Sequence, residues 1–165
     1  GRALEAAAAA RGRRLRYHLK IDTGMNRLGL RYDNLARTLP ELVASPHLEL
    51  VGVYTHFATA NDVGHPLFTD QRERFEYVLA RLLPEGYGVR PPLRHAANSA
   101  AMLRDSRVWF DRVRPGLLLY GVVPPPLENW TRPLNLLLSW AAIDAGPPEK
   151  STPITLGDGR PARSS

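Results

Sequence analysis

Two cationic side chains lie on either side of a short turn near the start of the sequence. Lys20 ends an alternating segment, and Arg27 follows seven residues later, beyond the turn Asp22-Thr23-Gly24. A strand that delivers one cation to a loop carrying a second is typical of a site for an anionic ligand, because both charges face the same space. The pattern therefore predicts an anion-binding corner around Lys20 and Arg27. Lys150 is the only other lysine in the chain.

Further polar side chains fall at or near the ends of later strand-like segments. They are His56, His95, Asn98, Ser99, Arg114 and Gly116. In parallel βα folds the ligand lies at the carboxyl ends of the strands, in the loops that follow them. We therefore expect these residues to form one shared site with Lys20 and Arg27.

The elements that must position this site alternate between strands and helices. Strands are expected at Leu15–Ile21, Leu48–Tyr54, Leu93–His95 and Leu117–Tyr120. Helices are expected at Leu4–Arg11 before Gly12, from Asp33 or Asn34 to about Ser45, from Thr69 to Pro84, and at Ser99–Arg104. This alternation predicts βα units and a parallel sheet. Four such strands are half of an eight-stranded βα barrel, or one small doubly wound sheet.

The composition is that of an ordinary soluble domain. The chain has 165 residues, of which 44% are hydrophobic and 23% charged, enough to bury a sizeable core. The apolar run Leu134–Ile143 is too short for a membrane span. The absence of cysteine excludes disulfides and thiolate chemistry and is compatible with a reducing cytoplasm.

Two other kinds of partner are not expected. The net charge of +6 could suggest nucleic acid, but the arginines are scattered singly among acids instead of forming a stripe. His18, His56 and His95 could suggest a metal, but no His-x-His pair or carboxylate ligand set accompanies them. We therefore expect neither a nucleic-acid partner nor a metal.

Four blocks of the sequence resemble consecutive blocks of the alanine racemases. They read Y-H-L-K-I-D-T-G-M-N-R-L-G from Tyr17, G-V-Y-T-H-F-A-T-A-N-D from Gly52, H-A-A-N-S-A-A-M-L-R from His95, and V-R-P-G-L-L-L-Y-G from Val113. The match covers about Leu15–Gly121. Alanine racemases are pyridoxal-phosphate enzymes of fold-type III with an N-terminal βα barrel and a C-terminal β domain.

The resemblance implies a fold, a reaction and partners. The expected fold is α/β: the C-terminal part of a (β/α)8 TIM-type barrel at residues 1–121. Residues 122–165 are then expected to be a Pro/Gly-rich, poorly ordered remnant of the C-terminal β domain, corresponding to a degenerate form of its beginning. The implied reaction interconverts L-alanine and D-alanine with pyridoxal 5'-phosphate, supplying D-alanine for peptidoglycan. The intact family member would be a cytoplasmic homodimer without a membrane or nucleic-acid partner.

The resemblance also implies roles at the anionic corner. Lys20 is similar to the lysine that the family carbamylates to orient the neighbouring arginine. Arg27 is similar to that arginine, which contacts the cofactor's phenolic oxygen and the substrate carboxylate. Asn26 stands where the family commonly has Gly, a mild departure because Asn tolerates a left-handed turn. His56 resembles the histidine behind the catalytic tyrosine. The alternative interpretation, that His56 is a structural histidine bonded to backbone, is almost as well supported.

The remaining roles concern the cofactor. Ser99, beside Asn98, resembles a phosphate ligand, although Asn-Ser alone is most often a helix cap. Gly116 and Leu117 would offer backbone N–H groups to the same phosphate. Arg114 resembles the arginine that donates to the pyridine nitrogen and, because Arg keeps its proton, leaves that nitrogen unprotonated.

The two catalytic groups of the family have no match in this sequence. The family's Schiff-base lysine lies in the first barrel strand, before the Lys20 block, and neither Lys20 nor Lys150 matches its motif. Pro153–Gly159 weakly resembles the block of the catalytic tyrosine, with Leu156 at the tyrosine position. We therefore expect a fragment that is inactive as an isolated chain. One alternative is a non-catalytic barrel fragment that binds the cofactor or phosphate. The other is a D-threonine aldolase-like enzyme, but the T-H-F-A-T-A and N-S-A-A blocks favour the racemase.

Overall fold

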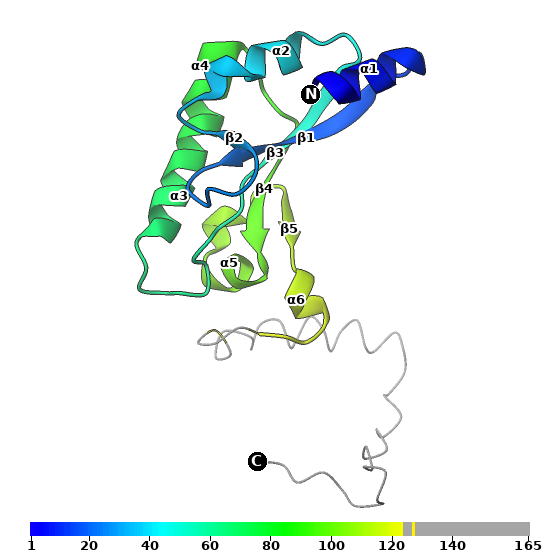
Figure 1. The fold of residues 1–165 in the computed structure, drawn as a ribbon. Coiled ribbons are helices and arrows are strands. Elements are labelled where there is room, and N and C mark those ends of the chain that lie inside the picture. Colours follow the sequence, from blue (N-terminus) through cyan, green and yellow to red (C-terminus); the bar gives the residue numbers. More distant parts are fainter. Residues whose placement is uncertain (124–126, 128–165) are drawn as a thin grey trace, which may run out of the picture. The chain divides into compact units, whose positions relative to one another are not determined.

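The computed structural model describes residues 1–123 and Leu127, and these form a parallel sheet with helices packed on it (Figure 1). The strand order is β2-β1-β3-β4-β5, and every neighbouring pair is parallel. The strands are β1 (Leu15–Asp22), β2 (Leu30–Arg31), β3 (Leu48–Tyr54), β4 (Leu93–Asn98) and β5 (Arg112–Arg114). The parallel sheet predicted from the alternating pattern is confirmed.

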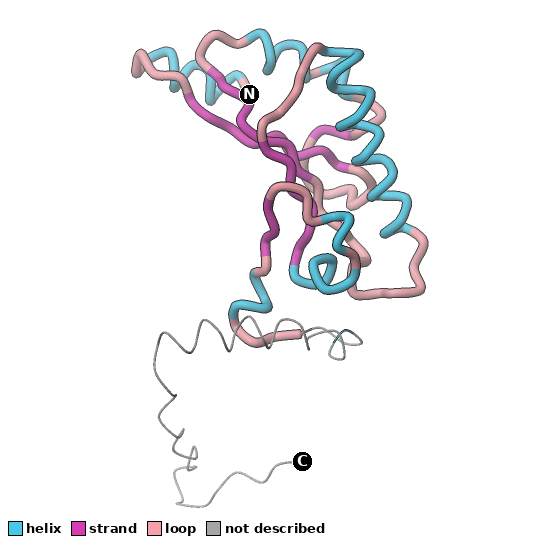
Figure 2. The backbone as a smooth tube through the Cα atoms, turned by 180° about the vertical axis from the view of Figure 1, so that it is seen from behind, coloured by secondary structure: helices cyan, strands magenta, loops and turns pink. Residues whose placement is uncertain are grey.

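A loop joins β1 to β2 and helical segments connect the later strands, and Figure 2 shows the longest helical stretch running beside the sheet. The α-helices are α1 (Arg2–Ala10), α2 (Leu39–Ala44), α3 (Leu67–Tyr77), α4 (Leu83–Tyr87), α5 (Ser99–Arg104) and α6 (Gly116–Leu119). Two 3₁₀ turns, η1 (Leu35–Arg37) and η3 (Ser106–Val108), and a π-helical segment, η2 (Val78–Leu82), complete the described elements. None of the helices in this part of the chain is long and apolar enough to cross a membrane.

The pleat of the sheet divides the side chains into an apolar face and a polar face. Leu19 and its register partner Val53 are buried in the core. Lys20 is in register with Tyr54, and Tyr54 with His95, so these three side chains share the opposite face. The strands thus deliver their polar residues to one side of the sheet, as the site requires.

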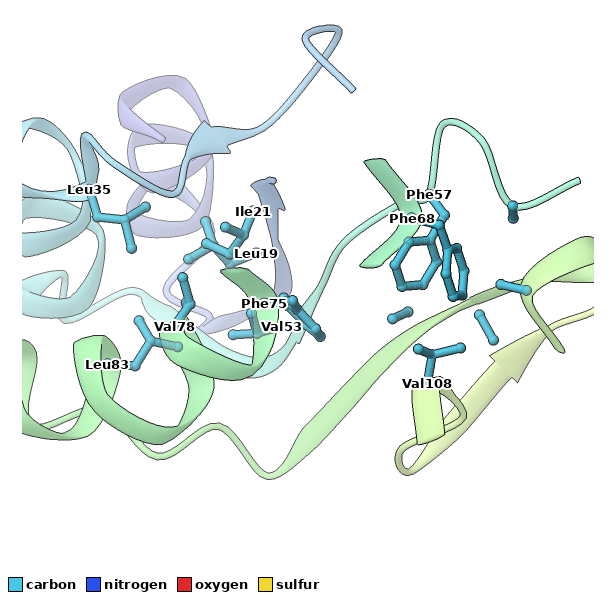
Figure 3. Close-up of a cluster of buried hydrophobic side chains, with 14 of the residues drawn as sticks. Leu19, Ile21, Leu35, Val53, Phe57, Phe68, Phe75, Val78, Leu83 and Val108 are labelled. Atoms are coloured by element: carbon cyan, nitrogen blue, oxygen red, sulfur yellow. The ribbon is translucent and has the colours of Figure 1, made fainter. Parts of the chain in front are cut away.

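The core lies between the apolar face and the long helical stretch (Figure 3). Phe75, Val78 and Leu83 pack toward Leu19 and Val53 in one part of the cluster. Three other fully or nearly fully buried side chains, those of Phe57, Phe68 and Val108, group together in Figure 3. The rings of Phe57 and Phe68 are 4.6 Å apart between centroids. Phe57 belongs to the loop that follows β3, so its packing on Phe68 of α3 anchors this loop in the core.

The long helix starts and ends differently from the sequence prediction. It begins at Leu67 after Pro66, so Thr69 lies inside its first turn, and it continues through Pro84 to Tyr87. Proline has no N–H to donate and its ring clashes with the carbonyl four residues earlier. The π-helical segment η2 widens the backbone just before Pro84 and accommodates the ring. The helix ends only at Gly88, whose φ of +63° is the left-handed conformation that stops helices.

The helix expected from Asp33 or Asn34 is divided in two. Residues Leu35–Arg37 form a 3₁₀ turn without a side-chain cap, and α2 restarts at Leu39. Pro40 lies in the first turn of α2, where its missing N–H costs no helical hydrogen bond. A continuous helix would have placed the same proline in its interior, where it removes a hydrogen bond, so the sequence disfavours it.

The expected strand at Leu117–Tyr120 is wrong. These residues belong to α6 and its end, and the last strand of the sheet is Arg112–Arg114 instead. A short apolar run fits a helix as well as a strand. The edge strand Arg112–Arg114 was not predicted, because two of its three residues are arginines. The two-residue strand β2 was also missed, being too short for any periodicity. The predictions for residues 124–126 and 128–165, including Leu156, fall outside the described part.

Replacing Phe75 by Ala tests the core. Phe75 is fully buried and meets Phe110 edge-to-face at 5.5 Å, so the Phe75→Ala variant should lose about 3–5 kcal/mol of unfolding free energy. Tyr77→Ala, at an exposed position of the same helix, is the matched control and should change little. The measurement is chemical denaturation, and equal losses for both variants would contradict this core.

Candidate functional site

A pocket of about 420 Å³ lies where the carboxyl ends of β3, β4 and β5 meet. Its lining contains residues predicted for the site and two others: His56, Asn61, Asn98, Ser99, Ala100, Arg114, Gly116 and Leu117. Residues separated by up to 61 positions in the sequence, from His56 to Leu117, are thus brought together. Among the residues that the structure describes, no carboxylate lines this pocket, so these walls favour an anionic ligand.

A larger cavity, of about 560 Å³, lies between α1 and α2 and is a poorer candidate. Its lining includes Glu5, Thr38, Glu41 and Leu48, none of which the sequence marks for chemistry. Leu48 is the first residue of β3, at the amino end of the strand. Ligands of parallel βα folds bind at the opposite end of the strands, and we therefore assign the site to the smaller pocket.

The loop that carries Arg27 is folded around the carboxylate of Asp22. One carboxylate oxygen accepts hydrogen bonds from the backbone N–H groups of Gly24 (2.9 Å), Met25 (2.9 Å) and Asn26 (3.1 Å). The other oxygen accepts the N–H of Arg27 at 3.1 Å. Burial alone would raise the pKa of Asp22, but the four N–H donors together hold it below its ordinary value. The φ of +56° at Asn26 confirms the left-handed turn expected there.

Lys20 lies under the same loop in a strongly cationic environment. A Cβ atom at Gly29, whose φ is +109°, would stand 2.6 Å from the carbonyl oxygen of Lys20, so only glycine allows the loop to close this tightly. The pKa of Lys20 is lowered, first by burial and then by the charges of Arg27 and Arg114, while the charge of Asp22 acts in the opposite direction. Arg27 and Arg114 therefore both lie close enough to Lys20 to affect its protonation.

His56 faces the same charges. It is half-buried and lines the pocket. Its pKa is lowered, first by burial and then by the charges of Arg114, Lys20 and Arg27. The neutral imidazole is therefore the favoured form, and it is available as a hydrogen-bond partner at the pocket wall.

Arg114 is held by three hydrogen bonds before any ligand arrives. One guanidinium nitrogen donates to the carbonyl oxygens of Thr55 (2.8 Å) and Ala96 (3.0 Å), and the other lies 2.6 Å from Nδ1 of His95. The guanidinium also lies 5.3 Å from the centroid of the Tyr54 ring. The side chain is thereby fixed at the pocket by partners from β4 and from the carboxyl end of β3.

The contact with Arg114 determines how the neighbouring histidines are protonated. Because a guanidinium only donates, Nδ1 of His95 must accept, and the proton of the neutral ring is then on Nε2. That nitrogen lies 2.9 Å from Nδ1 of His18, which must accept in turn. The ring of His95 stacks on Tyr54 at 4.9 Å between centroids, and Gly52 leaves room for the His18 ring where any Cβ would clash. The sequence did not predict this chain of hydrogen bonds.

Asn98 and Ser99 both have structural partners as well as a place at the pocket. Asn98 caps α5, accepting the N–H of Ala101 at 2.9 Å, and donates to the carbonyl of Phe57 at 3.4 Å. The hydroxyl of Ser99 accepts the N–H of Leu118 at 3.3 Å and thereby ties α5 to α6. The helix-cap interpretation of this pair is therefore correct for Asn98, while Ser99 brings a buried hydroxyl to the wall.

The loop after β3 is fastened by an arginine that sequence reasoning missed. Arg104, in the last turn of α5, donates to four carbonyl oxygens at 2.8–3.3 Å, those of Thr59, Ala60, Asp62 and Val63. Asn61 lies within this segment and lines the pocket. Both residues lie within the blocks that resemble the alanine racemases, but nothing in those blocks indicates that Arg104 binds the carbonyl groups of a distant loop. Across the described residues, no group of three or more His, Asp or Glu side chains is arranged to hold a metal.

The Asp22→Asn variant tests the folding of the Arg27 loop. An amide has one acceptor oxygen where the carboxylate has two, so buried N–H groups lose partners and the free energy of unfolding should fall by about 1–3 kcal/mol. Because the folded-state pKa of Asp22 is depressed, the deficit relative to the native chain should be full above about pH 4 and shrink below it. Denaturation curves across this range provide the measurement, with Asp62→Asn at an exposed carboxylate as control. A deficit that does not vary with pH would contradict the assignment.

The titration of His95 tests the hydrogen-bond chain. Its pKa is lowered to about 4, first by burial and then by the charges of Arg114, His18 and Arg112. The unfolded chain therefore binds the proton first as the pH falls, and stability should decline between about pH 6.5 and pH 4. NMR titration of the ring should give a midpoint near 4, with the Nε2–H tautomer above it. A midpoint near the ordinary histidine value would contradict this account.

Comparison with solved structures places this geometry in a known fold. The alanine racemase of Streptomyces lavendulae matches with a TM-score of 0.72 and 39% identity, over 82% of this chain and 35% of that one. An alanine racemase from Bacillus anthracis with bound L-Ala-P matches with a TM-score of 0.62 and 41% identity, over 73% and 30% of the two chains. The parallel sheet is accordingly part of a βα barrel, and the doubly wound alternative is set aside.

Comparison of sequences gives the same result. The alanine racemase of Symbiobacterium thermophilum is 42% identical over 140 residues, 85% of this chain and 37% of the relative. That of Carboxydothermus hydrogenoformans is 47% identical over 108 residues, 66% of this chain and 28% of the relative. The chain thus spans about a third of the length of these relatives. The profile described as "Alanine racemase, N-terminal domain" matches residues 1–124, and the chain belongs to this family.

Proposed function

We propose that this chain forms the cofactor- and carboxylate-binding part of a pyridoxal-phosphate-dependent alanine racemase. The observation that carries the proposal is the pocket at the ends of β3, β4 and β5, which gathers His56, Ser99 and Arg114 and has no carboxylate among its described lining residues. Lys20 and Arg27 add positive charge to the same region. A phosphate ester and an amino-acid carboxylate are both anions of the kind such a region attracts.

The residues present fit pyridoxal 5'-phosphate. The place where a Cβ would stand on Gly116 is open, with no atom within 4 Å. The N–H groups of Gly116 and Leu117 begin α6, where helical backbone donors lack a partner within the helix. Together with the hydroxyl of Ser99 they would hold the phosphate, with Asn98 fixing the start of α5 beside them. Arg114 uses three of its five N–H donors on the protein, which leaves donors for the pyridine nitrogen.

The residues of this chain have distinct tasks in the proposed reaction. The cofactor, when bound, supplies the electron sink that makes the α-proton of alanine removable. Arg114 would hold the ring nitrogen without releasing a proton to it and so restrain that sink. Arg27 would bind the substrate carboxylate, since a planar guanidinium matches it bidentately, and Lys20, once carbamylated, would orient Arg27. His56 would position the catalytic tyrosine of the family, a residue that has no match in this sequence.

The rest of the proposal concerns the whole protein. Residues 1–121 are assigned to the barrel domain and residues 122–165 to a remnant of the C-terminal domain. The intact protein would act as a homodimer in the cytoplasm, converting L-alanine to D-alanine for peptidoglycan. The name of the Bacillus anthracis structure, which includes L-Ala-P, supports an alanine-shaped substrate for that relative and motivates the same choice here.

Titration of the chain with pyridoxal 5'-phosphate tests the proposal. The native chain should bind it with a change in cofactor absorbance, and inorganic phosphate should compete. Ser99→Ala and Arg114→Lys should each weaken binding by roughly tenfold or more, because each removes a directed hydrogen bond to the anion. Arg107→Gln, which removes an exposed arginine paired with Asp105, is the control and should leave the affinity unchanged. Equal affinity in all four proteins would contradict the proposed site.

A further inference from the structure

Helix α3 carries a polar side chain that is completely buried and is absent from every motif of the site. Gln71 has 0% exposure and lies among apolar neighbours on the inner side of the helix. Burying an amide is unfavourable unless all its polar atoms are bonded. The hydrogen bonds of the Gln71 amide must therefore compensate for its burial.

The amide of Gln71 connects two segments that are far apart in the sequence. Its oxygen accepts the N–H of Ala58 at 2.9 Å, and its nitrogen donates to the carbonyl of His56 at 3.0 Å and to the hydroxyl of Thr23 at 3.3 Å. The orientation of the amide is unambiguous, because the backbone N–H of Ala58 only donates and the carbonyl of His56 only accepts.

The two segments are the loops that carry Arg27 and His56. Thr23 directly follows Asp22, whose carboxylate folds the loop through Arg27, and the Thr23 carbonyl accepts a hydrogen bond from Arg74 at 2.9 Å. The hydroxyls of Thr23 and Thr55 are 2.7 Å apart, and both residues are fully buried. A side chain at Gly24 would meet the side chains of Arg74, Leu67 and Gln71, so the turn packs directly on α3.

We propose that Gln71 is a positioning residue that fixes the Arg27 loop relative to the His56 loop, so that helix α3 sets the geometry of the anionic pocket. The meaning of this geometry for catalysis rests on the proposed function, whereas the coupling of the two loops does not. A buried amide whose oxygen and nitrogen are both bonded selects one arrangement, because a shift of either loop breaks its hydrogen bond to Thr23, His56 or Ala58.

The chemistry at position 71 is specific to glutamine. Leucine fills a similar volume but leaves the N–H of Ala58 and the carbonyl of His56 unsatisfied. Glutamate keeps the shape and accepts from Ala58, yet its second oxygen faces the carbonyl of His56 unless it carries a proton. The Gln71→Glu variant should therefore regain loop order as the pH is lowered and the carboxyl becomes a donor, a dependence that Gln71→Leu lacks.

Hydrogen exchange of individual amides, measured by NMR on the full chain, tests the coupling. In Gln71→Leu the amides of Gly24–Arg27 and of Ala58 should exchange about tenfold or more faster relative to the core amide of Val53. Phe75→Leu, one turn further along the helix and equally buried, is the matched control, in which loop and core amides should accelerate by a common factor. The proposal is overturned if only Ala58 accelerates, or if the loops follow the core as in the control.

A second pair of variants applies if Gln71→Leu does not fold. Thr23→Val removes only the hydroxyl and should accelerate exchange at Ala58, across the network, whereas Thr23→Ser retains the hydroxyl and should restore the native rate. Identical rates in both variants would overturn the coupling. The cofactor titration described above remains separate: loop coupling in a chain that fails to bind pyridoxal 5'-phosphate would sustain this inference and contradict the proposed function.

Discussion

The candidate site depends above all on one buried carboxylate. Asp22 receives four backbone N–H groups in succession and so folds the segment after β1 into a closed loop. These hydrogen bonds stabilise the charged carboxylate, and its negative charge partly offsets the lowering of the Lys20 pKa by burial and by Arg27. The loop that Asp22 shapes carries Arg27 to the region of Lys20 and Arg114, where these three cations outnumber the one carboxylate.

Positive charges held this close repel one another, and the structure offsets the repulsion in two ways. Arg114 donates to two carbonyl oxygens and a neutral imidazole, so its charge is stabilised by dipoles alone. Burial and the neighbouring cations lower the pKa values of His56 and His95, which favours the uncharged form of these two rings. The geometry is supported from outside the pocket by helix side chains: Arg74 and Gln71 from α3 hold the first loop, and Arg104 from α5 holds the loop after β3.

The sequence predicted those parts of the fold whose signals are local. β3 and α5 were placed at their observed bounds, because a run of β-branched and apolar residues and an Asn-Ser start are strong local patterns. The error at Leu117–Tyr120 arose where a short apolar run had no local property to distinguish helix from strand. The predicted end of the helix at Pro84 was wrong for a different reason. The helix continues past the proline because the π-helical segment η2 accommodates it.

The same division applies to the site. Residues that end strands, such as His56 and Ser99, could be found from position and motif, and the pocket contains them. Gln71 and Arg104 could not, because their partners are backbone atoms of other loops, and nothing in the local sequence records which loop passes a given side chain. Asn61 lies in an irregular segment with no periodic signal at all.

The most direct test of the central claim is chemical-shift mapping of pyridoxal 5'-phosphate on the isotope-labelled chain. The assignment of the site to the carboxyl ends of the strands predicts that the backbone amides of Ser99, Gly116 and Leu117 shift first and most, followed by those of the Arg27 loop. The largest shifts around Thr38 and Glu41, in the cavity between α1 and α2, would contradict it.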